Sequence, residues 1–276
     1  MAKRKQTPQV EMPFLDHLEE LRWRLIRAMI ALGIGMILCF FVAPYILEFL
    51  KYPASQLDPP LIFQFLKVQA IFIVYIEIGF FGGLTLTLPY LLFQIWSFVS
   101  PGLMPTERKY FLPLVVFSTG LFLIGLTFAF LVILPIALEF FVGLAPDGIE
   151  ANIAIDLYIG FAIRIMFLFG LIFELPMVCY FLAKIGLLTD ELMRKYRRHG
   201  IVAIFIIAAL LTPPDPVTQV FLGVPLVLLY EFSIYIVAMV VRKRKKREAV
   251  EEARYQALLE EERRLEEEKR TEQEGS

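Results

Sequence analysis

Three glutamates are candidates for chemistry because of the sequence in which they lie. Glu174 falls in LFGLIFELPMVCY, roughly in the middle of a long apolar run. An unpaired charge at that depth of a membrane span costs about 2.5–3.5 kcal/mol to insert, so we expect Glu174 to face other helices or a hydrated groove. Glu20 and Glu107 lie instead in HLEELRWRL and GLMPTERKY, two interfacial segments that otherwise carry positive charge.

Each acid also has an ordinary structural explanation. Glu20 stands four residues before Arg24, and such a pair on one helix face contributes a few tenths of a kcal/mol. Glu107 falls in the first turn of a predicted helix with Thr106 as its cap, where the helix dipole favours an acid. The residues alone do not decide between these structural explanations and a binding role.

The other charged residues in apolar segments have less need of a functional explanation. Arg164 lies ten residues before Glu174, about 15 Å along a helix, so we expect no direct pair between the two. Glu174 is then either a hydrogen-bonded structural acid or a functional group. Packing or snorkelling accounts for Glu77, Glu139 and Glu231.

Several kinds of active site have no counterpart in the sequence. It contains no Walker A sequence, serine-nucleophile motif or HExxH. His17 and His199 are far apart, and Cys39 and Cys179 both lie in apolar runs, as small packing residues do. We therefore expect no enzyme, no cofactor, no metal site and no nucleic-acid partner.

The elements that position these residues are membrane spans. Apolar residues make up 58% of the chain and the mean hydropathy is +0.67, which excludes an ordinary soluble domain. We expect an all-α membrane protein with an extension at 1–13, a transmembrane domain at 14–241 and a charged tail at 242–276. The six spans are predicted at about 25–45, 68–98, 110–141, 157–185, 200–212 and 217–241.

Local features refine this arrangement. Residues 14–27 form an amphipathic helix leading into the first span, where Gly33 and Gly35 leave room for a neighbouring helix. The proline-rich loop that follows should form a small cap on one membrane face, and Pro135 should kink the third span. The fifth span is too short for an ordinary crossing, which thinning of the bilayer would accommodate.

The distribution of Lys and Arg predicts the orientation. One side carries the N-terminal basic residues, Arg108 and Lys109, the cluster at 194–198 and the run at 242–247, whereas the other side carries Lys51 and Lys67. Six crossings with both termini in the cytoplasm satisfy this pattern.

Four motifs in order, HLEELRWRL, QIWSFVSPGLMPTERKYFLPL, FGLIFELP and LLTPPDPVTQ, resemble the TatC family, the multispanning subunit of the twin-arginine protein translocase. The resemblance covers about residues 14–241. It implies a concave, cup-like bundle of six helices in the cytoplasmic (inner) membrane. It also implies that the protein binds folded precursors through their twin-arginine signal peptides, together with small single-span subunits of the TatA and TatB type, and we expect a homo-oligomer.

The resemblance also assigns roles to residues. Glu20 and Glu107 match the acids that receive the paired arginines, and Arg22 and Phe98 match further residues of the recognition region. A carboxylate can accept a guanidinium through two hydrogen bonds, which a lysine cannot reproduce. Glu174 matches an acid of the concave face, and Pro53 matches a proline of the first external loop. The polar cluster where partner subunits dock is matched by Thr212, Asp215 and Gln219. Pro216 departs from the family pattern.

Two functions follow as hypotheses. The first is a signal-peptide receptor and core translocase subunit that uses the proton-motive force, as the resemblance implies. The alternative is a proton-coupled small-solute secondary transporter with Glu174 as its titrating group. The sequence shows no inverted repeat, which counts against the alternative.

Overall fold

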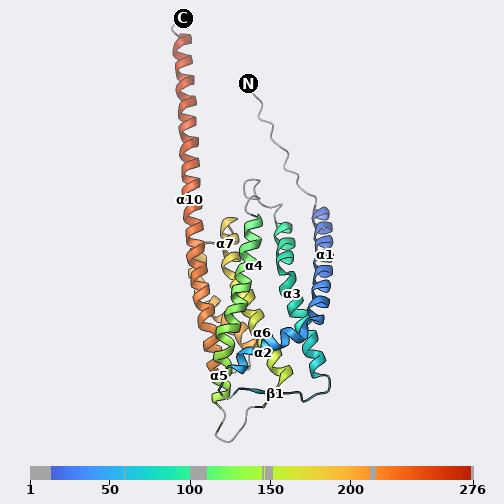
Figure 1. Cartoon of the computed structure of the whole chain (residues 1–276). Coiled ribbons are helices and arrows are strands. Elements are labelled where there is room, and N and C mark those ends of the chain that lie inside the picture. Colours follow the sequence, from blue (N-terminus) through green and yellow to red (C-terminus); the bar gives the residue numbers. More distant parts are fainter. Residues whose placement is uncertain are drawn as a thin grey trace. The chain divides into compact units, whose positions relative to one another are not determined.

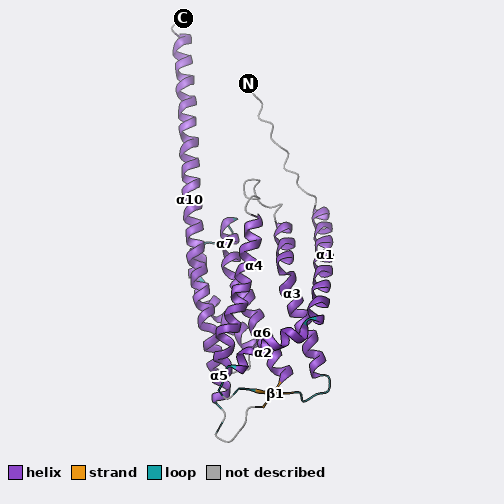
Figure 2. Cartoon of the chain, viewed as in Figure 1, coloured by secondary structure: helices purple, strands orange, loops and turns teal. Residues whose placement is uncertain are grey.

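Helices make up nearly all of the chain that the computed structural model describes, namely residues 14–58, 60–99, 111–144, 146, 152–211 and 216–274 (Figure 2). By its internal packing the chain divides into two units. The first unit comprises Met1–Glu174 with Ile207–Leu222, and the second comprises Leu175–Ile206 with Gly223–Ser276.

The first unit is built around one long helix, α3 (Ala70–Val99), which lies between α1 (Phe14–Phe41) on one side and α4 (Phe111–Phe128) and α6 (Ile155–Phe173) on the other (Figure 1). Its shorter elements are α2 (Ala43–Ser55), β1 (Ile62–Gln64), the π-helical turn η3 (Ala129–Ile133), α5 (Leu134–Gly143) and β2 (Asn152–Ala154).

Glycines allow α1 and α3 to approach closely. A Cβ on Gly35 would lie 2.7 Å from Thr87 Cγ2 and 2.9 Å from the Gly83 carbonyl oxygen, and a Cβ on Gly83 would overlap the backbone of Met36. The predicted role of Gly35 is thus confirmed, whereas Gly33 has nothing within 4 Å of its Cβ position. The glycine partner on α3 replaces the GxxxG spacing that α1 lacks.

A small cap follows α1, as predicted. The helix α2 runs across the bundle (Figure 1), and the Tyr158 hydroxyl donates a 2.7 Å hydrogen bond to the Leu50 carbonyl. The ring of Phe63 packs on Tyr158 at 4.8 Å between centroids. In parallel register, β1 pairs with β2, with Phe63 opposite Ile153. The cap therefore joins the segment after α1 to the start of α6.

Two details of the predicted architecture are wrong. The first span does not continue to Tyr45, because α1 ends at Phe41 and α2 begins at Ala43 with a proline in its first turn, where the missing N–H costs no hydrogen bond. The all-α class is also incomplete, because β1 and β2 form a short two-stranded sheet. Three residues per strand leave too little alternation for a sequence pattern to reveal.

Proline effects fall close to where the sequence places them. The π-helical turn η3 directly precedes Pro135, which stands in the first turn of α5. Proline removes one backbone donor and clashes with the preceding turn, and a π-turn is a common way to absorb both. The third predicted span is thus the continuous run α4–η3–α5.

The second unit contains α7 (Leu175–Lys184), α8 (Asp190–Lys195), most of α9 (Arg197–Leu211) and most of α10 (Pro216–Glu274). Gly186 ends α7 with φ +87°, a left-handed conformation that suits glycine, and the amide of Leu187 donates to the Leu182 carbonyl at 2.9 Å. Thr189 then caps α8 by accepting from the Leu192 amide at 3.2 Å.

Five helical stretches of the described residues are long and apolar enough to cross a membrane. They are Leu18–Phe41, Ala70–Phe98, Leu112–Gly143, Ile155–Lys184 and Gln219–Arg264. The remaining predicted span, 200–212, falls in α9, whose 15 residues extend about 22 Å. That length is below the roughly 30 Å of a bilayer core, so a sixth crossing stays a prediction.

Candidate functional site

The N-terminal part of α1 brings a carboxylate and a guanidinium together. Arg24 donates to Glu20 Oε1 through Nε at 2.9 Å and also through Nη2. The spacing of four residues places both side chains on one face of the helix. The guanidinium also reaches across to α3, where Arg24 Nη1 donates to Gln94 Oε1 at 3.4 Å.

Burial strengthens this arrangement. The Arg24 and Glu20 side chains are only 18% and 26% exposed, and Gln94 is buried. Reduced access to water raises the strength of charge-assisted hydrogen bonds. The structure therefore shows Glu20 accepting a guanidinium through two nitrogens in a partly desolvated position.

The other residues of the predicted recognition region lie on the same two helices or in the segment that follows. Phe98 is half-buried on α3, one helical turn after Gln94, and Arg22 is exposed on α1. Glu107 lies outside the described residues. The predicted meeting of Glu20 with Glu107 therefore stays a prediction.

Glu174 lies at a break in the fourth predicted span. The helix α6 ends at Phe173 and α7 begins at Leu175, and Pro176 cannot donate the backbone bond that would continue α6. The Glu174 Oε1 atom is buried, and so is the Ser118 hydroxyl oxygen on α4. These two side chains are near enough to interact electrostatically, so α4 supplies a polar neighbour for the acid.

A second charged cluster was missed by the sequence reasoning. Glu77 on α3 and Arg164 on α6 both lie beside Gly160: a Cβ there would lie 3.4 Å from Glu77 Oε2 and 3.6 Å from Arg164 Nη2, and the arginine acts on the acid electrostatically. Asp156 also acts on Glu77 electrostatically. Glu77 therefore lies near an opposite charge on a neighbouring helix, which packing or snorkelling alone does not describe. A lone arginine within a span was the signal that could have pointed to an acid on another span.

The second unit holds another missed pair. Arg197 on α9 forms an ion pair with Glu231 on α10, and the nearby Tyr230 hydroxyl donates to the Met193 carbonyl at 3.1 Å. Glu231 therefore joins two helices of this unit, which packing or snorkelling alone does not describe.

The remaining predicted site residues are placed unevenly. Pro53 is buried in the last turn of α2, and Gln219 is half-buried on α10. Thr212 and Asp215 lie outside the described residues. Within the residues that the structure describes, no group of three His, Cys, Asp or Glu side chains is placed to hold a metal ion.

Comparison with known proteins gives a consistent result. The family model TatC, described as Sec-independent protein translocase protein (TatC), matches residues 16–225. The chain is 37% identical over 234 residues to a protein of that description from Desulforapulum autotrophicum, covering 84% of this chain and 86% of the relative. It is 38% identical over 236 residues to the one from Aquifex aeolicus, covering 85% and 98%.

Solved structures agree with the sequence relatives. A crystal structure described as the twin arginine translocase receptor TatC matches with a TM-score of 0.76 and 36% identity, covering 81% of this chain and 99% of that one. A second, described as the same receptor in DDM, matches with a TM-score of 0.75 and 38% identity, covering 80% and 98%. This chain therefore belongs to the TatC family of Sec-independent protein translocase proteins, multi-pass membrane proteins that serve in protein transport.

Proposed function

We propose that this chain is the receptor for twin-arginine signal peptides in a translocase that exports folded proteins across the cytoplasmic (inner) membrane. The observation that carries the proposal is the bonding of Glu20 to the Arg24 guanidinium through two nitrogens. A carboxylate held in this way can accept an arginine of a visiting peptide with the same geometry.

The other residues of the recognition region are proposed from their positions in the chain. Gln94 joins Arg24 to α3, and Phe98 lies on the same face of α3 one turn later. Glu107 is eight residues beyond the end of α3 at Val99, a distance that the extended chain could span up to about 28 Å. We therefore propose Glu20 and Glu107 as the two acceptors, with Arg22 and Phe98 beside them.

The membrane arrangement belongs to the same proposal. We propose that the five candidate spans and the short helix α9 make six crossings with both termini in the cytoplasm, an arrangement that the Lys and Arg distribution supports. We propose a concave bundle that carries Glu174 on its inner face and docks TatA- and TatB-type subunits at Thr212, Asp215 and Gln219. The proton-motive force would supply the energy, because the sequence carries no Walker A nucleotide site. The proposed assembly is a homo-oligomer.

Nothing in the family assignment favours the alternative of a small-solute transporter. The relatives described above are all protein translocase proteins. The half-buried Glu174 side chain is compatible with either function, so it does not discriminate between them.

Photo-crosslinking tests the receptor proposal. A photoreactive residue at position 98 of the full-length protein in membranes is exposed to a precursor with an intact Arg-Arg pair or with Lys-Lys. We expect Glu20→Ala and Glu107→Ala each to reduce crosslinking to the Arg-Arg precursor several-fold, and the double variant to reduce it further. A charge-assisted hydrogen bond of about 1.5–3 kcal/mol corresponds to such losses.

Glu19→Ala is the matched control, because Glu19 is an exposed acid adjacent to Glu20 on the same helix. It should leave crosslinking unchanged. Undiminished crosslinking in the Glu20→Ala, Glu107→Ala double variant would refute the assignment of these two acids.

A further inference from the structure

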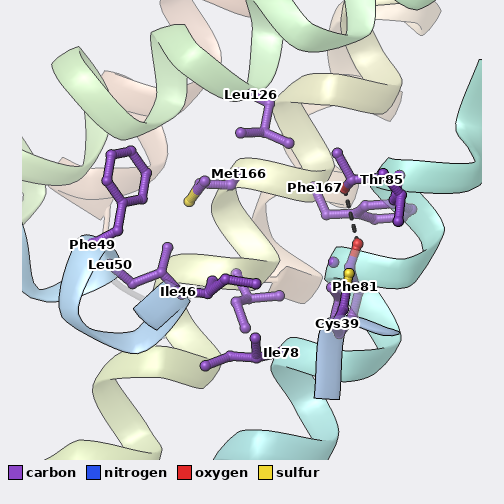
Figure 3. Close-up of a pocket in the computed structure, with 13 residues that line it drawn as sticks. Cys39, Ile46, Phe49, Leu50, Ile78, Phe81, Thr85, Leu126, Met166 and Phe167 are labelled. Carbon is purple, nitrogen blue, oxygen red and sulfur yellow. Dashed lines mark hydrogen bonds between the residues drawn. The ribbon is translucent and has the colours of Figure 1, made fainter. Parts of the chain in front are cut away.

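An apolar cavity of about 350 Å³ lies inside the first unit, enclosed by residues of α1, α2, α3, α4 and α6 (Figure 3). Its lining is apolar apart from Cys39 and Thr85. The Thr85 hydroxyl already donates to the Phe81 carbonyl at 2.8 Å. Because a buried water needs two to four polar partners, this cavity gives water little to bind.

The cavity opens at the surface of the unit and continues into a second hollow. Two of its lining residues, Phe49 and Leu86, are 58% and 57% exposed. The second hollow, of about 390 Å³, shares Phe49 and Leu126 with the first and has Glu48 and Tyr52 at its edge. The space thus leads from an apolar interior to a rim with polar groups.

The size of the space limits what can fill it. A membrane-spanning helix about 10 Å across and 27 Å long occupies on the order of 2,000 Å³, far more than either hollow. A single hydrocarbon chain is narrow and flexible enough to enter. In a bilayer it gains the dispersion contacts that an empty void would forfeit, rather than the ordinary hydrophobic driving force.

A charged pair on α2 indicates the head group: Glu48 lines the second hollow, and Lys51 follows it by one helical turn. Lys51 donates to Glu48 Oε1 at 2.7 Å, and the Glu48 and Lys51 side chains are 73% and 30% exposed. An adjacent acid and base complement a head group that carries both charges, with an ammonium beside Glu48 and a phosphate beside Lys51. Tyr45 and Tyr52, both more than half exposed on α2, are the amphipathic aromatic residues that favour a membrane interface.

We propose that the first unit binds one phospholipid, with an acyl chain in this cavity and a zwitterionic, amine-bearing head group at Glu48 and Lys51. The lipid would fill the space between α2 and the bundle and so support the cap. This site is separate from the acids assigned to signal-peptide binding.

Native mass spectrometry of the full chain tests the proposal. The protein is equilibrated with phosphatidylethanolamine and phosphatidylglycerol of identical acyl chains at equal amounts. We expect one retained lipid and a several-fold preference for phosphatidylethanolamine. The double variant Glu48→Gln, Lys51→Gln should retain a lipid but lose this preference.

Cavity-filling variants test the position of the acyl chain. Leu126→Trp fills the boundary of the two hollows and should reduce lipid retention several-fold, and Thr85→Leu should do so with a smaller change in volume. Leu123→Trp is the control, because Leu123 is 45% exposed on the same helix and lines neither hollow. Unchanged retention in both cavity variants, or equal retention of the two lipids by the unaltered chain, would overturn the proposal.

Discussion

At the scale of single residues, opposite charges within the membrane part of the chain are placed against each other rather than left to the lipid. Glu77 and Arg164 come from helices α3 and α6 and meet where Gly160 lacks a side chain. Because lipid solvates neither ion, each is the other's best available partner. Removing one should leave an uncompensated charge in the first unit.

A double-mutant cycle measures this pairing. We expect Glu77→Gln and Arg164→Gln each to lower the thermal midpoint of the detergent-solubilised protein, and the double variant to lose less than the sum of the two. The coupling energy should lie between roughly 0.5 and 3 kcal/mol, as for neighbouring residues that interact. Glu139→Gln serves as a control acid, and additive losses at 77 and 164 would show that the two residues do not interact.

Contacts between single residues also determine the geometry of the candidate receptor site. Arg24 orients and partly neutralises Glu20, because it bonds the carboxylate through two nitrogens and also donates to Gln94. An incoming arginine could share these bonds or replace them. The i, i+4 pair with Arg24 is therefore compatible with the proposed binding role of Glu20.

At the scale of elements, backbone proximity between α1 and α3 decides where the proposed site lies. Gly35 and Gly83 let the two helices approach until side chains of one contact the backbone of the other. This packing places Arg24 of α1 within hydrogen-bonding distance of Gln94 of α3. The geometry of the site therefore depends on glycines well away from it.

Alanine at Gly83 tests that dependence. A Cβ at this position would lie 2.7 Å from Met36 Cα, so the helices must separate, and we expect a loss of roughly 1–3 kcal/mol in stability. Gly33→Ala is the matched control on α1, since its Cβ has nothing within 4 Å. Thermal unfolding in detergent compares the two variants; equal midpoints would contradict the close-packing account.

The cap shows how a short element can be fixed by few contacts. A single buried hydrogen bond from Tyr158 to the Leu50 carbonyl, one ring contact and three pairs of strand residues connect α2 and β1 to α6. Each contact is modest, about 0.5–1.5 kcal/mol for the hydrogen bond. Their convergence on one place explains why so short a sheet forms.

At the scale of the whole molecule, the charged tail is a helix without a core of its own. The helix α10 continues from its apolar part through the basic run to Glu274, and every residue of 242–258 is exposed. Arg244 pairs with Glu248 within the helix at 2.8 Å, and such local pairs support a solvated helix. Lys245 also lies 3.9 Å from Glu191 of α8, so the basic run contacts another helix of the second unit.

Truncation after residue 248 tests whether the distal part of the tail contributes to the fold. We expect removal of 249–276 to leave membrane insertion and the thermal midpoint unchanged, because it deletes exposed side chains and keeps Arg244 and Lys245. A deletion from 242 onward is the comparison and should lower the midpoint. A fall of several degrees with the shorter deletion would mean that the distal tail contributes to the fold.

Family membership also belongs to the scale of the whole chain. The matched region, residues 16–225, includes α1 through the first part of α10 and stops before the charged tail. The four sequence motifs all lie inside it. The tail therefore has to be understood from its own charges, whereas the membrane region can be compared with its relatives.

The sequence alone determined the class of protein, the positions of most membrane spans and the family, because these depend on hydropathy along the chain and on local motifs. It also indicated the role of Gly35 and the effect of Pro135, which act within one helix or on its nearest neighbour. Even so, it placed the end of the first span at about Tyr45, since it did not show that a separate helix, α2, begins at Ala43.

Only the tertiary structure decided which distant residues meet. The Glu77–Arg164 pair, the bond from Arg24 to Gln94 and the two-stranded sheet each join segments separated by tens of residues. Such contacts depend on how closely and at what rotation the helices pack, and packing is a property of complementary surfaces rather than of spacing along one helix. The apolar cavity has the same origin, because its walls come from five helices that no single stretch of sequence describes.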